Sequence, residues 1–195
     1  MKFFLKTLLF LCLLQLVGVI SPLSAWALPS YKVALLPAMD TAKYQEPAVL
    51  KLMDEKIAVK FKYPYYDRLP NNEVQAAIQN MTFEKAASLY NEESMRSLSQ
   101  TLSADIIIAV ELAKARCINI NSPFYVDNSY VDMDISVNAY IYSRKDNHYF
   151  TLTFGESGVK RMSIDTSVYH AVNRLMDKVN AALPYERIPK EFQKQ

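Results

Sequence analysis

VDMDISVNAYIY, residues 131–142, alternates strictly between apolar and polar side chains. Because successive side chains of a β-strand point to opposite faces of a sheet, this pattern predicts an antiparallel strand with one buried and one solvated face. The buried face is expected to consist of Val131, Met133, Ile135, Val137, Ala139 and Ile141. After a polar turn at 143–147 the chain returns with Phe150, Leu152 and Phe154 on one face. The two segments therefore predict a β-hairpin.

Three more strands are expected upstream of this hairpin. Residues 31–37 are apolar on both faces, as in a central strand, and end at a proline. Residues 63–69 predict a second strand, in which Pro64 marks an edge or an irregular start. Residues 104–118 contain the most apolar run, Ile-Ile-Ile-Ala-Val at 106–110. The β-branched side chains of this run favour a buried strand over a helix.

Apolar side chains at helical spacing occur in the segments between the strands and near the end of the chain. Pro47 suits the first turn of a helix, and Asn72 is expected to cap a second, short one. Residues 82–102 predict a helix pair or one interrupted helix, with a second start at Asn91. The last helix is expected to bury one stripe, formed by Val168, Ala171, Val172, Leu175, Met176, Val179 and Leu183.

The predicted order of elements is β-α-β-α-α-β-β-β-α. Since the hairpin has one solvated face, we expect a two-layer α/β sandwich, with a mixed sheet and with the helices packed on one face. Residues 28–195 are enough for a single α/β domain with its own core, ending in a short polar C-terminal tail.

The first 27 residues follow the pattern of a secretory signal peptide. Lys2 and Lys6 form a basic start, residues 8–20 are almost wholly apolar, and Ala25 and Ala27 supply the small residues of a cleavage site. The apolar core is short for a membrane span, which needs about 20 residues, so cleavage is favoured over an uncleaved anchor. We therefore expect a periplasmic or secreted protein.

Charge and composition exclude several classes of function. Two of the 22 basic residues lie in the leader, which leaves 20 against 20 acidic residues. This balance provides no basic surface for nucleic acid, and membrane contact is expected only through an uncleaved leader. Only Gly155 and Gly158 lie beyond the leader, so glycine-rich phosphate loops are excluded. Cys117 is expected to be a buried, inert thiol, with pairing between chains as the alternative.

Candidate catalytic and metal-binding residues are sparse. His148 and His170 are the only histidines, and neither has a partner at metal-ligand spacing. Asp132 and Asp134 share a strand face, about 7 Å apart, a spacing open to a hard cation. An ordinary solvated face is favoured, because the glycine and the terminal glutamate of an EF-hand loop are missing. No Gly-x-Ser-x-Gly motif occurs. We expect no enzyme activity, no cofactor and no metal.

Tyrosine is used unusually often, with 13 residues in the chain. Tyr140 and Tyr142 share the polar strand face with Ser136 and Asn138. We expect this face to bind a partner, because tyrosine combines a large contact area with few rotatable bonds. The alternative is that the rings stack on side chains of neighbouring strands.

Two short motifs are similar to those of a known family. Residues 33–37, Val-Ala-Leu-Leu-Pro, resemble the opening VAVLPF strand shared by the curli-secretion lipoprotein, the N-terminal domain of the Tol-system periplasmic protein, and the lipoprotein activators of penicillin-binding proteins. Residues 102–108, Leu-Ser-Ala-Asp-Ile-Ile-Ile, resemble their later L-x-A-D-hydrophobic segment, where a helix leads into a central strand. The hairpin at 131–154 and the closing helix correspond in order, although Ala38 replaces the family's phenylalanine and the turn lacks its Thr-Gly pair.

The resemblance implies a protein of envelope assembly or maintenance that binds partners and performs no chemistry, and it supplies no catalytic residue. No lipobox cysteine is present. We therefore expect an exported, non-catalytic cell-envelope protein that contacts an envelope protein partner of unknown identity, with a homo-oligomer as a further expectation. The alternative is a periplasmic module that binds a small ligand or a glycan.

Cleavage is expected after Ala27, which leaves Leu28 at the mature N-terminus, because small residues at Ala25 and Ala27 follow a short apolar core. Intact-mass measurement of protein purified from the envelope fraction checks this. A mass that retains residues 1–27 would contradict it and favour the uncleaved anchor.

Overall fold

A computed structural model describes residues 30–81, 89–121 and 129–193 of the chain. The predictions made for the leader, residues 1–27, and for the first part of the segment 82–102 lie outside these ranges.

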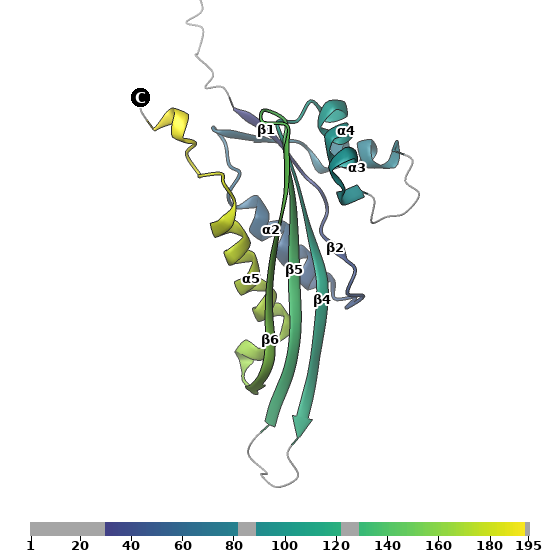
Figure 1. The fold of residues 1–195 in the computed structure, drawn as a ribbon, viewed down its shortest axis with the longest axis vertical. Helices are drawn as coiled ribbons and strands as arrows, with labels where there is room; N and C mark the ends of the chain where they lie inside the picture. The colour runs from purple at the N-terminus through teal and green to yellow at the C-terminus, as the bar shows by residue number, and fades with distance from the viewer. Residues whose placement is uncertain (1–29, 82–88, 122–128, 194–195) are drawn as a thin grey trace, which may run out of the picture.

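The strands and helices follow the predicted order, with one short strand added. The strands are β1 (Tyr31–Leu35), β2 (Met39–Asp40), β3 (Tyr66–Arg68), β4 (Ile106–Asn121), β5 (Ser129–Ser143) and β6 (His148–Arg161). The α-helices are α2 (Pro47–Ala58), α3 (Asn71–Gln79), α4 (Glu92–Leu102) and α5 (Val168–Ala182), and the 3₁₀ turns are η2 (Ile164–Thr166) and η3 (Lys190–Phe192). The described residues form an α/β domain in which the long strands β4 and β5 extend well beyond the helices α3 and α4 at one end of the sheet (Figure 1).

The strands form one mixed sheet in the order β3-β1-β4-β5-β6, and β2 pairs with β4 beyond the end of β1. β1 runs parallel to both β3 and β4, whereas β4, β5 and β6 are antiparallel to one another. The predicted hairpin at 131–154 is the β5–β6 pair, with Ser143 opposite His148. The predicted mixed sheet and α/β sandwich are thus confirmed.

The inner face of the sheet is covered by α2 and α5. The apolar residues of β5 that the alternation singled out are all buried there, together with the stripe of α5. Val49, Leu52, Met53 and Ile57 of α2 complete this core. The two helices also contact each other, because Lys56 pairs with Asp177 at 2.7 Å.

The opposite, outer face is not bare, and the expectation of helices on one face alone was wrong. Helices α3 and α4 cover the end of the outer face near β1, where Leu36, Ile107 and Ala109 are buried against Met95 and Leu98. The physical reason lies in the strands themselves. β1 and the first part of β4 are apolar on both faces, so each face needs a hydrophobic cover.

The outer helices begin close to the two positions where N-caps were predicted, with one difference. The Asn91 side chain accepts a hydrogen bond from the Ser94 N–H at 2.8 Å and so caps α4, as expected. Asn72 is not a cap, because α3 already begins at Asn71 and Pro70 occupies the cap position without a side-chain hydrogen bond. Proline fixes the backbone ahead of the helix instead.

Leu98→Ala is expected to lower the free energy of unfolding by about 2–5 kcal/mol. Leu98 is fully buried between α4 and the outer face of the sheet, so truncation leaves a cavity. Ser97→Ala, on the exposed side of α4, is the control and should change it by less than about 0.5 kcal/mol. Urea unfolding followed by circular dichroism measures both. Equal effects of the two changes would show that α4 does not pack on the sheet.

Candidate functional site

The outer face of β5 was the predicted partner surface, and the alternation behind that prediction is confirmed. The inward residues from Val131 to Ile141 are at most 2 % exposed. The outward residues Asp132, Asp134, Ser136, Asn138 and Tyr140 are all half-buried. Whether a partner can reach each outward side chain depends on how much of it the outer helices and neighbouring side chains cover.

Tyr142 is not available to a partner, which corrects the expectation that its ring meets solvent. Its side chain is 3 % exposed and belongs to the core beneath α3 and α4. Its hydroxyl donates a hydrogen bond to Asn147 Oδ1 at 2.9 Å and so ties the strand to the β5–β6 turn. Tyr142 faces outward as predicted, but the outer helices cover it.

Tyr140 is covered in part. Its ring stacks on that of Tyr90, two residues before α4, with the centroids 5.3 Å apart and the planes at 19°. Its hydroxyl donates a 2.5 Å hydrogen bond to Glu111 Oε2. Burial, with this hydrogen bond as a second cause, raises the pKa of Tyr140 to about 12. The side chain is therefore fixed by the fold.

Glu111 is the centre of a polar network that the sequence did not single out. Its side chain is buried on the outer face and accepts hydrogen bonds from Thr41 Oγ1 at 2.6 Å, Asn138 Nδ2 at 2.9 Å and Tyr140. Burial alone would raise the pKa of Glu111, but the three hydrogen bonds outweigh it and lower the pKa. A lone acid between Val110 and Leu112, in an otherwise apolar run, was the signal for this site.

The two remaining predicted residues differ in their bonding. Asn138 donates to Glu111 and accepts from Thr153 Oγ1 at 2.9 Å, so its amide is engaged on both sides. Ser136 is half-buried opposite Gly155 and Lys114. Tyr140 and Asn138 thus join one network with Glu111. Tyr142 lies in the core, and Ser136 lies two residues from Asn138 on the same strand face.

Asp132 and Asp134 form ion pairs across the β4–β5 ladder. Arg116 contacts Asp132 at 2.8 Å and Lys114 contacts Asp134 at 3.3 Å. Both pairs are partly exposed, and pairs of this kind contribute little to stability. Within the described ranges no three histidine, cysteine or acidic side chains gather as a metal site would require.

From Asp132 to the end of the described strands, the outer face carries a cluster of exposed apolar side chains. This distal patch consists of Ile118 and Ile120 of β4, Tyr130 of β5 and Val159 of β6, with exposed fractions of 48, 42, 36 and 61 %. Ile118 lies opposite Asp132 and Ile120 opposite Tyr130, so these side chains share the outer face. The alternation of Ile118 and Ile120 in the sequence was the available signal.

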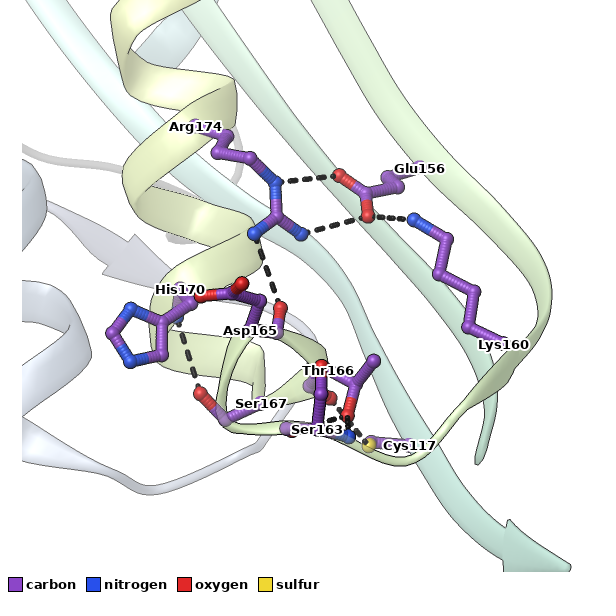
Figure 2. A network of polar contacts seen from close by, with 9 residues as sticks. All are labelled: Cys117, Glu156, Lys160, Ser163, Asp165, Thr166, Ser167, His170 and Arg174. Carbon is purple, nitrogen blue, oxygen red and sulfur yellow. Dashed lines mark hydrogen bonds and ion pairs between the residues drawn. The ribbon is translucent and has the colours of Figure 1, made fainter. Parts of the chain in front are cut away.

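On the inner face, a polar network fixes the return of the chain from β6 to α5 (Figure 2). Arg174 of α5 reaches Glu156 of β6 at 2.8 Å, and Lys160 also pairs with Glu156. Arg174 Nη1 donates to the Asp165 carbonyl oxygen at 3.1 Å. Hydrogen bonds from Arg174, against the effect of burial, keep the pKa of Glu156 low. The network joins helix to strand through an ionised Glu156.

Cys117 lies beside this turn and is exposed, which corrects the expectation of a buried thiol. Its Sγ contacts the Thr166 carbonyl oxygen at 3.7 Å. The strand residue faces inward, opposite Met133. Helix α5 begins only at Val168, past this position, so the thiol stays exposed beside η2.

Glu111→Gln is expected to lower the free energy of unfolding at neutral pH by about 1–3 kcal/mol, since it removes a charged hydrogen-bond acceptor. Because the pKa of folded Glu111 is lowered, its contribution is present above the pKa of the unfolded chain and is lost as the pH falls below roughly 4. Unfolding at pH 7 and pH 3 measures the difference. Glu93→Gln, an exposed control, should show little effect at either pH. A Glu111→Gln deficit of equal size at both would contradict the role of the charge.

No helix among the described residues is long and apolar enough to span a bilayer. No protein-family model and no curated protein matches the sequence. Solved structures with a similar arrangement include lipoprotein GNA1162 from Neisseria meningitidis, at 11% identity over 79% of this chain and 100% of that one, with a TM-score of 0.45.

Two further structures show the same level of similarity. The PelC dodecamer from Paraburkholderia phytofirmans is 8% identical over 80% of this chain and 90% of that one, with a TM-score of 0.44. The LpoB C-terminal domain from Escherichia coli is 6% identical over 66% and 84%, with a TM-score of 0.40. At these values the similarity carries no argument about function, which has to be argued from the chain's own residues.

Proposed function

We propose that this chain is an exported, non-catalytic protein of the cell envelope that acts through contacts with a protein partner. The observation that carries the proposal is the distal patch. It places three exposed aliphatic side chains and one tyrosine around Asp132 on the outer sheet face, at the end of the long strands away from the outer helices (Figure 1).

Burial of the distal patch against a partner would be energetically favourable. Burying an aliphatic or aromatic side chain completely is worth about 1.5–3 kcal/mol, and Ile118, Ile120 and Val159 each keep two fifths or more of their area in water. Tyrosine at such a surface supplies area together with a hydroxyl. Asp132 lies between Ile118 and Val159 on this face, and Arg116 neutralises its charge in an ion pair, so the patch combines apolar area with one paired charge.

The neighbouring strand edge supports the same proposal. β6 is the last strand of the sheet and pairs only with β5 among the described strands. An edge strand presents backbone N–H and C=O groups that a partner strand can bind. Since Val159 lies on β6, a strand added at this edge would lie next to the distal patch.

The location in the envelope rests on the leader-like residues 1–27 and on the short motifs at 33–37 and 102–108. The identity of the partner is open, and a second copy of the chain is one candidate. An even balance of acidic and basic residues beyond the leader removes charge repulsion between copies. Relative to the sequence-based expectation, the proposed contact moves along the strand, from Tyr140 to Tyr130.

The double change Ile120→Ser with Val159→Ser is expected to weaken partner binding by roughly 2 kcal/mol or more, which is about thirtyfold. The tagged full chain is used to capture partners from envelope extracts, and binding is then titrated with the recovered partner. The fold should survive, because both side chains are exposed.

Val59→Ser with Ile188→Ser is the matched control, because both residues are exposed aliphatic side chains away from the distal patch. It should bind like the unchanged chain. Undiminished capture by the Ile120→Ser, Val159→Ser variant would contradict the proposed surface. Retention of glycan without any protein partner would contradict the function and favour the ligand-binding alternative.

A further inference from the structure

The connections that follow β1 and β3 leave the sheet toward opposite faces, and this creates a crevice near one edge of the sheet. β1 and β3 are adjacent and parallel. The helix that follows β1, α2, packs on the inner face, whereas the helix that follows β3, α3, packs on the outer face. In open α/β sheets, such a divergence separates the two connecting loops and opens a crevice outside the carboxyl ends of the strands, where ligands commonly bind.

A cavity of about 300 Å³ lies at this point. Its walls come from the end of β1, from α2, from the end of β3 and from the first turns of α3. The volume is at the lower end of the range of small-molecule sites, which starts at about 300 Å³. Leu36 and Val74 form an apolar floor, and the charged side chains Asp54, Glu55 and Arg68 stand on the walls.

One wall of the crevice is acidic. Asp54 Oδ1 accepts a hydrogen bond from the Ala38 N–H at 2.8 Å, which fixes the carboxylate toward the loop after β1. Burial raises the pKa of Asp54, and the Ala38 hydrogen bond opposes this only in part. Its neighbour Glu55 has only a loose, exposed contact with Lys51, at 3.8 Å. A cationic group in the cavity would offset the burial of Asp54.

The other wall is basic. Arg68 ends β3, lines the cavity and forms no ion pair with any described residue. Helix α3 begins three residues later, with Asn71 on the wall and without a side-chain cap over its first N–H groups. A guanidinium beside the positive end of a helix dipole is a favourable place for a carboxylate.

We propose that this crevice binds a small zwitterion of the size of an amino acid or a dipeptide, with its ammonium group against Asp54 and its carboxylate against Arg68. The two charges come from opposite walls, α2 and β3, so a ligand that carries both signs complements the crevice better than an ion of one sign. The site is separate from the distal patch and does not depend on the proposed protein partner.

The isotope-labelled full chain is titrated with alanyl-alanine, and its backbone amide resonances are followed by NMR. Binding with a dissociation constant in the millimolar range is expected, with shifts at Ala38, Ala58 and Val74 around the crevice. N-acetyl-alanyl-alanine, which lacks the ammonium group, and alanyl-alanine amide, which lacks the carboxylate, should each bind roughly tenfold more weakly or worse.

Arg68→Gln and Asp54→Asn should each weaken alanyl-alanine binding by roughly tenfold or more. Asparagine keeps an oxygen that accepts the Ala38 N–H, so Asp54→Asn removes the charge and retains the contact that holds the loop. Arg187→Gln is the matched control, because Arg187 is exposed and does not line the cavity. Thermal unfolding of each variant verifies that the fold is intact.

Three results would overturn the proposal. They are the absence of shifts at the crevice at millimolar peptide, equal binding of the blocked and unblocked peptides, and unchanged binding by folded Arg68→Gln. None of them bears on the distal patch, whose test uses different residues and a protein partner. The two proposals therefore fail or stand separately.

Discussion

The structure depends on the requirement that β1 and the first half of β4 be buried on both faces. Ile106 and Ile108 point to the inner core and Ile107 and Ala109 to the outer one, and all four are almost fully buried. A strand of this kind needs helices on both sides. The second half of β4 carries Lys114 and Arg116 on its outer face, so this part of the face can stay in contact with water and needs no covering helix. The sheet therefore has a covered end and an open end.

This division explains which predictions succeeded. Alternation in 131–142 gave the strand, its buried face and the hairpin partner, because a period of two is set by local geometry. The position of α3 and α4 is set by the opposite face of β4, which a local pattern does not assign to one helix or another. Tyr142 was placed on the correct face, but its burial depends on those helices. Capping at Asn91 was predictable, whereas Pro70 displaced the expected cap at Asn72.

The residues of the candidate sites also fall into two groups, those that a local sequence pattern indicates and those that only the fold brings together. Glu111 lies where the cover by the outer helices ends, and its carboxylate is satisfied by Thr41, Asn138 and Tyr140, which come from distant parts of the chain. Their convergence follows from strand pairing and has no signature in any one segment. Ile118 and Ile120, in contrast, alternate visibly in the sequence. The crevice at Asp54 and Arg68 follows only from the topology, since the two residues lie on different elements.

The length of β4 and β5 separates the two ends of the domain by a fixed distance. β1 begins beside the covered end of the β4–β5 pair, where Asp105 accepts a hydrogen bond from the Lys32 N–H. The distal patch lies near the other end, at Ile120, some 15 residues further along the chain, or roughly 50 Å at the rise of a β-strand. The start of β1 and a partner on the patch would thus lie at opposite ends of the long β4–β5 pair. The strand length, rather than a flexible linker, would set the distance between the partner and the N-terminal end of the domain.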